Sequence, residues 1–282
     1  MPDYDPSTFD GRLSARARAA DTLLCVGLDP DRGRMPDGIP DSAAGAAELC
    51  TRVIDATADL AVAYKPNLAF FLAWGREGLD ALYSVRQRIP AEVPVILDCK
   101  VGDVDSTSAA YATSWFDELG VDAITVHPYL GEDALAPFME YAGKGVIVLA
   151  KTSNPGSGDL QDRTLADTGA PVYRYIARRA ATWNEAYPAT LGLVVGATWP
   201  EQLREIRQDA PSLPILLPGL GAQGGDLDAS LAAALRPDGT GVLCSVSRGI
   251  MYASSGDDVV DAARAAASGF RDRINAVRHA RA

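Results

Sequence analysis

The stretch Val95-Ile96-Leu97-Asp98-Cys99-Lys100-Val101-Gly102-Asp103 places charged side chains directly after an apolar run. The run predicts a buried strand over residues 94–98. Side chains alternate along a strand, so Asp98 and Lys100 are expected to share one face. Asp103 follows a glycine, and Thr107 lies one helical turn beyond it. Parallel α/β sheets carry their chemistry at this end of the strands, although a structural ion pair closing the strand end is the alternative.

Seven further apolar segments resemble this strand, and a helical pattern follows each of the eight. The expected strands span residues 22–28, 60–64, 94–98, 121–126, 145–150, 191–196, 214–217 and 241–244. The expected helices after them span 42–59, 74–88, 106–118, 132–142, 170–187, 201–208, 227–235 and 257–277. Eight such units predict a (β/α)8 TIM barrel, a single domain over residues 1–282. An open doubly wound sheet, the alternative, usually has fewer units.

A short helix over residues 6–20 precedes the first strand, with Ser7 or Asp10 as its expected cap. The polar residues at the strand ends would all face one mouth of the barrel. They are Asp29, Lys65, Asp98, Lys100, His127, Ser153, Gln223 and Arg248. We expect a flexible polar lid from residue 153 to 158, with an ordinary surface loop as the alternative.

A glycine-rich turn follows the seventh strand, from Pro218 through Gln223 and Gly224 to residue 225. Backbone N–H groups in such a turn can approach an anion, and barrels often bind phosphate after strands seven and eight. Arg248, after the eighth strand, would add a fork of donors. A plain tight turn is the alternative for the glycines alone, and the pairing with Arg248 favours a phosphate site.

The composition of the chain limits the classes of binding partner and the kinds of site that we expect. The formal charge of −11 argues against nucleic acid or an anionic membrane as a partner. The start of the chain is acidic and polar, unlike a signal peptide, and the apolar runs are only strand-length, so we expect a cytoplasmic protein. Four cysteines without paired spacing indicate free thiols, and two histidines make a metal site unexpected.

The ordered set of motifs resembles the orotidine 5'-phosphate decarboxylase family, specifically its longer bacterial subgroup. The resemblance covers most of the chain and rests on seven segments: residues 24–30, 65–71, 98–103, 125–131, 152–156, 218–225 and 247–249. It implies the decarboxylation of orotidine 5'-monophosphate to uridine 5'-monophosphate in pyrimidine synthesis, by a homodimer that needs no cofactor. Four positions depart from the usual subgroup pattern: Asn67, Val101, Asp105 and His127.

The resemblance also implies residue roles. Lys100 would protonate the pyrimidine, Asp98 would lie against the departing carboxylate, and Lys65 would hold the array. Asp103 and Thr107 would reach into the partner's site. The substrate contacts would come from Asp29 at the ribose, Ser153 at the pyrimidine, and Pro218, Gln223, Gly224 and Arg248 around the phosphate.

Two other functions compete with this interpretation. The Asp-x-Lys-x-x-Asp spacing also occurs in related metal-dependent sugar-phosphate lyases and decarboxylases, which would lose activity on chelation. A non-catalytic nucleotide-binding regulator is the second competitor. It would be favoured if a charged member of the array were missing, and none is.

Overall fold

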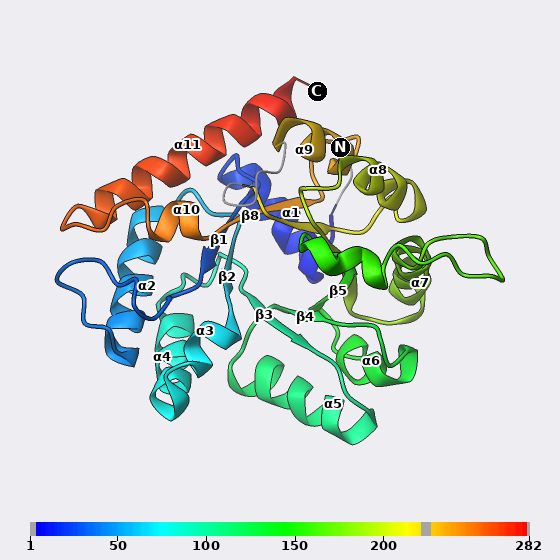
Figure 1. Ribbon diagram of the computed structural model, residues 1–282, viewed down its shortest axis with the longest axis horizontal. Helices are drawn as coiled ribbons and strands as arrows, with labels where there is room; N and C mark the ends of the chain where they lie inside the picture. Colours follow the sequence, from blue (N-terminus) through cyan, green and yellow to red (C-terminus); the bar gives the residue numbers. More distant parts are fainter. Residues whose placement is uncertain (1–3, 221–226, 281–282) are drawn as a thin grey trace.

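The computed structural model describes residues 4–220 and 227–280, and within them eight parallel strands form a barrel ringed by helices (Figure 1). This confirms the predicted barrel class. The strands are β1 (Leu24–Leu28), β2 (Ala63–Pro66), β3 (Ile96–Val101), β4 (Ala123–Val126), β5 (Gly145–Lys151), β6 (Thr190–Val195), β7 (Ile215–Pro218) and β8 (Val242–Val246).

The helices follow the strands in the expected alternation. They are α1 (Phe9–Ala19), α2 (Ala43–Thr57), α3 (Leu68–Leu72), α4 (Gly75–Arg88), α5 (Asp105–Ala112), α6 (Glu132–Met139), α7 (Val172–Ala186), α8 (Pro200–Asp209), α9 (Leu227–Ala234), α10 (Arg248–Met251) and α11 (Val259–His279). A π-helical segment, Thr113–Glu118, extends α5, and a 3₁₀ turn, Pro155–Asp159, follows β5. None of the described helices combines the length and apolarity that a membrane crossing needs.

The strands pair in the order β2-β1-β8-β7-β6-β5-β4-β3. The circle closes between β2 and β3 through isolated bridges, Tyr64 with Val95 and Asn67 with Asp98. Apolar residues fill the strands almost without interruption, as expected for a parallel sheet that is buried on both faces. Because β2 and β3 are joined only by these isolated bridges among the described residues, the β2–β3 seam has fewer backbone pairings than the β1–β2 and β3–β4 ladders on either side.

Helix α1 closes the N-terminal end of the barrel and leaves the other end open (Figure 1). Its buried side chains include Phe9 and Leu13, and Leu13 lies against the N-terminal ends of β1 and β8. A Cβ on Gly145 would come within 2.5 Å of the Phe9 ring, so the start of β5 needs glycine there. The cap is Thr8, whose hydroxyl accepts from the Gly11 amide at 3.0 Å, so the expected Ser7 or Asp10 cap is wrong.

Several elements differ locally from the prediction; β3, expected over residues 94–98, runs from Ile96 to Val101 and so includes Lys100. Strand β2 begins at Ala63 and includes Lys65, because residues 60–62 are buried without pairing as a strand. The short helices α3 and α10 begin directly after β2 and β8, where the sequence pattern is too short to predict a helix.

Candidate active site

The open end of the barrel contains a cavity of about 540 Å³. Seven of the predicted site residues line it: Asp29, Lys65, Asp98, Lys100, Ser153, Pro218 and Arg248. Gln223 and Gly224 lie outside the described residues. Asp103 and Thr107 do not line the cavity of their own chain. The cavity also has a polar lining that the sequence did not single out, from Thr125, Thr152, Gln161, Ser245 and Ser247.

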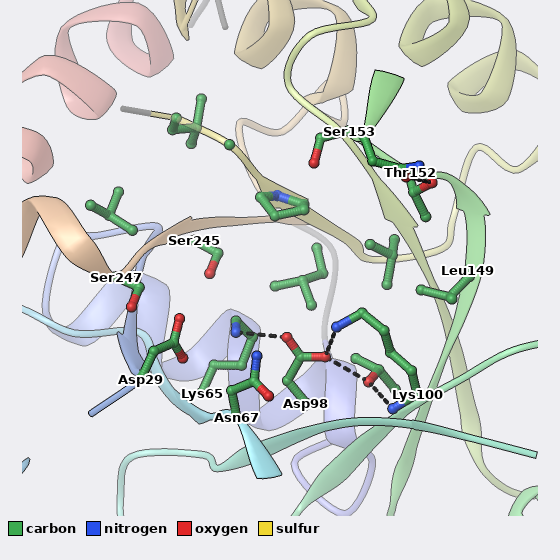
Figure 2. Close-up of a pocket in the computed structure, with 18 of the residues that line it drawn as sticks. Asp29, Lys65, Asn67, Asp98, Lys100, Leu149, Thr152, Ser153, Ser245 and Ser247 are labelled. Carbon is green, nitrogen blue, oxygen red and sulfur yellow. Dashed lines mark hydrogen bonds and ion pairs between the residues drawn. The ribbon is translucent and has the colours of Figure 1, made fainter. Parts of the chain in front are cut away.

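At the floor of the cavity, one carboxylate lies between two ammonium groups (Figure 2). Lys65 Nζ is 2.9 Å from Asp98 Oδ2, and Lys100 Nζ is 2.5 Å from Asp98 Oδ1. Lys65 is only 5% exposed, whereas the Lys100 side chain is 47% exposed. Lys65 is therefore fixed within the barrel, and Lys100 can reach a molecule in the cavity.

The charges in this trio stabilise one another against burial. Burial alone would raise the pKa of Asp98, but the ammonium groups of Lys65 and Lys100 outweigh it and hold that pKa below its usual range. Burial alone would lower the pKa of Lys65, but Asp98, and then Asp29, hold it above its usual range. Asp98 and Lys65 are thus both ionised at neutral pH.

The backbone of β3 is irregular at this point. Leu97 lies opposite Ile124 and Val101 lies opposite Val126, so β3 advances four residues while β4 advances two. Lys100 has a φ of 46°, in the left-handed region that non-glycine residues seldom adopt. The result is a bulge over residues 98–100 that carries both charged side chains.

The wall beside Lys65 holds two buried oxygens without a hydrogen-bond partner among the described residues. They are Oδ1 of Asp29 and the hydroxyl of Ser247, and both residues lie on the same side of the cavity (Figure 2). A Cβ on Gly27 would come within 2.6 Å of the Ser247 Cβ, so the close approach of β1 to this residue requires glycine. Unpaired buried polar groups are costly, and a ligand rich in hydroxyl groups would satisfy them.

The segment between β5 and α7 brings Ser153 to the cavity and is anchored at its base. Lys151 is fully buried, and its Nζ donates to Asp162 at 2.7 Å and to Ser157 at 3.0 Å. The same ammonium lies 4.6 Å from the centre of the Trp199 ring, whose Nε1 donates to the Thr152 carbonyl. The base of the expected lid is therefore fixed, and its closing motion stays a prediction.

The far side of the cavity has the character expected of an anion site. Arg248 is exposed at the start of α10, and no carboxylate of the described chain pairs with it. Gly219, beside Pro218, has a φ of 97°, a conformation that favours glycine. Residues 4–220 and 227–280 contain no group of three or more His, Cys, Asp or Glu side chains placed to hold a metal ion.

Asp103 and Thr107 lie on the rim, beyond the cavity. Asp103 Oδ1 accepts from the Val104 amide at 2.7 Å, and the Asp103 amide donates to Ser108 Oγ. Thr107 is exposed on α5. The contacts of Asp103 fix the turn into α5, and its second carboxylate oxygen makes no hydrogen bond to the described residues.

Comparison with known proteins finds relatives over nearly the whole chain. The model of the "Orotidine 5'-phosphate decarboxylase / HUMPS family" matches residues 22–266. An orotidine 5'-phosphate decarboxylase of Thermomicrobium roseum is 49% identical over 271 residues, which are 96% of each chain. One from Roseiflexus castenholzii is 51% identical over 269 residues, covering 95% of this chain and 97% of that protein.

A solved structure supports the same relationship. The Leishmania donovani OMP decarboxylase superposes with a TM-score of 0.84 at 45% identity, covering 96% of this chain and 99% of that one. Sequence and structure thus agree over nearly the whole length of both proteins. The chain is therefore an enzyme of the orotidine 5'-phosphate decarboxylase family.

Proposed function

We propose that the protein converts orotidine 5'-monophosphate to uridine 5'-monophosphate in pyrimidine biosynthesis. The observation that carries this proposal is the Asp98 carboxylate held between Lys65 and Lys100, in a cavity that reaches to Arg248. The names of the relatives, at 49% and 51% identity, support the same reaction. We further propose that residues 1–282 act as one catalytic domain in the cytoplasm.

Lys100 supplies the proton in the proposed reaction. The bond between C6 and the carboxyl group breaks, CO₂ leaves, and the electron pair remains on C6. No neighbouring group delocalises that charge, so an ammonium held beside C6 stabilises it electrostatically. The C6 carbanion then takes a proton from Lys100 Nζ, which recovers one from solvent.

The other residues hold the substrate in place. Asp98 lies beside the substrate carboxylate, where repulsion in the ground state is relieved as CO₂ departs. Asp29 accepts from the ribose hydroxyl groups, Ser153 contacts the pyrimidine edge, and Arg248, together with the turn at 218–225, binds the phosphate. Binding energy from the remote phosphate then orients the ring at Lys100.

The first test is the loss of orotate absorbance when the protein is mixed with orotidine 5'-monophosphate, with and without a chelator. We expect rapid turnover that the chelator leaves unchanged, because the proposed proton donor is a lysine. Turnover that stops on chelation would favour a metal-dependent lyase. Absence of turnover with retained uridine 5'-monophosphate binding would instead favour a regulatory nucleotide-binding protein.

We also propose a homodimer in which Asp103 and Thr107 enter the partner's cavity. Large apolar side chains are exposed near the rim that carries these residues: Val104, Tyr111, Leu130 and Tyr129, the last of which is 79% exposed. Exposed aromatic and aliphatic groups of this kind are typical of protein interfaces. A second copy of the chain would cover them and complete each site.

Mixing two inactive variants tests the shared site. Lys100→Ala and Asp103→Ala are each expected to be inactive alone. After refolding together in equal amounts, half of the dimers are mixed and one of their two sites is intact, so activity should recover to about a quarter of the wild-type value. Recovery near zero, or a monomer in sedimentation, would contradict the shared site.

A further inference from the structure

Thr125, on β4, makes three hydrogen bonds to the bulge that carries the charged side chains. Its hydroxyl oxygen accepts from the Cys99 amide at 3.1 Å and from the Lys100 amide at 3.0 Å. The same hydroxyl donates to Asp98 Oδ1 at 3.0 Å. The residue is 1% exposed. One side chain therefore contacts all three consecutive residues of the bulge.

The direction of these bonds is fixed by the number of protons. A hydroxyl has one hydrogen and two acceptor lone pairs. Two backbone N–H groups occupy the lone pairs, so the single hydrogen is left for the Asp98 carboxylate. The hydroxyl thus takes the place of the backbone acceptor that β4 would offer to a regular strand, and it turns one carboxylate oxygen toward Lys100.

We propose that Thr125 is a positioning residue for the decarboxylation: its hydroxyl holds the bulge of residues 98–100 so that the Asp98 carboxylate and the Lys100 ammonium are presented together to the substrate. The inference rests on the proposed function for its catalytic part. It does not make Thr125 a catalytic residue, because its hydroxyl is fully used by three hydrogen bonds within the chain and acts through Asp98 and Lys100.

The expected cost of removing the hydroxyl follows from geometry. Valine has nearly the shape of threonine, so Thr125→Val leaves the packing in place but leaves two partly buried N–H groups without an acceptor. The left-handed backbone at Lys100 then loses the bonds that hold it. A displacement of about 1 Å in a reacting group can lower the rate by about 100-fold.

The experiment compares Thr125→Val with Thr125→Ser, which keeps the hydroxyl. For Thr125→Val we expect kcat to fall by about 10- to 100-fold, while KM and the affinity for uridine 5'-monophosphate stay within about threefold, because the phosphate and ribose contacts lie elsewhere. Thr125→Ser should recover most of kcat. Thr22→Val is the matched control, because Thr22 is another fully buried threonine whose hydroxyl accepts a backbone N–H, that of Leu24, at the opposite end of the barrel.

A second readout does not depend on substrate. Amide hydrogen exchange at Cys99 and Lys100 should accelerate at least tenfold in Thr125→Val and stay near the wild-type rate in Thr125→Ser and Thr22→Val. Unchanged exchange in Thr125→Val, or an equal loss of kcat in Thr22→Val, would overturn the inference.

The two readouts separate failure of the inference from failure of the proposed function. If the wild-type protein does not decarboxylate orotidine 5'-monophosphate, the proposed function falls and the catalytic part of the inference falls with it. The exchange rates then still decide whether the hydroxyl holds the bulge. If the wild type turns over and Thr125→Val keeps its kcat, only the inference is overturned.

Discussion

Lys100→Ala is expected to lower kcat by about 10⁴-fold or more, because it removes both the proposed proton donor and the positive charge nearest to the proposed reaction centre. General acid catalysis typically contributes about 10²- to 10⁴-fold, and a preorganised charge adds a further factor of about 10²- to 10³-fold. The 47% exposure of this side chain makes it the ammonium that can reach the substrate. Loss of orotate absorbance measures the rate.

Binding and a second lysine provide the controls for this result. Affinity for uridine 5'-monophosphate should change little in Lys100→Ala, because the proposed phosphate and ribose contacts are untouched. Lys144→Ala removes a lysine that bonds the Val121 carbonyl on the far side of the molecule, and should leave kcat unchanged. A Lys100→Ala enzyme that retained a tenth of its rate would contradict the assignment of Lys100 as proton donor.

Asp98→Asn is expected to destabilise the fold by about 3–5 kcal/mol, since it leaves the buried ammonium of Lys65 without its carboxylate partner. The Lys65–Asp98 contact is 2.9 Å long, and both side chains are nearly inaccessible to solvent. Urea unfolding at pH 7 measures the loss. Lys100→Ala is the matched control, because it removes the more exposed ammonium and keeps the buried pair.

The pH dependence of stability provides an independent check on the same pair. The pKa of Asp98 lies below its ordinary value of 3.8 in the folded protein. A depressed carboxyl pKa contributes stability that is present above the ordinary value and is lost as the pH falls toward the folded one. The urea midpoint of the wild type should therefore fall more steeply between pH 5 and 3 than that of Asp98→Asn. Parallel slopes would contradict this account of the ion pair.

The class of fold and the contacts between the charged residues followed from local patterns. Eight apolar runs with a helix after each are sufficient to indicate the barrel, since few other folds alternate so regularly. Charged residues at the strand ends then converge on one mouth, as Asp29, Lys65, Asp98 and Lys100 do. The phosphate turn stays a prediction, because Gln223 and Gly224 lie outside the described residues.

Other parts of the site depend on contacts that no local pattern reports. In the sequence, Thr125 is an ordinary β-branched residue of an expected strand. Its proposed role arises only because β4 lies beside the bulge in β3. The buried Lys151 reads as a charge at a strand end, and its partners Asp162 and Trp199 are brought to it by the folded chain. Tertiary pairing of this kind overrides local preference.

The seam between β2 and β3 links the chemistry of the site to the closure of the barrel. Few backbone bridges join these two strands, and the Lys65–Asp98 contact crosses between them. The same two side chains thus link the two strands that close the barrel and lie at the centre of the candidate site. A substitution of either residue would therefore also remove the ion pair that links β2 to β3, so the closure of the barrel and the chemistry of the candidate site constrain the same two positions.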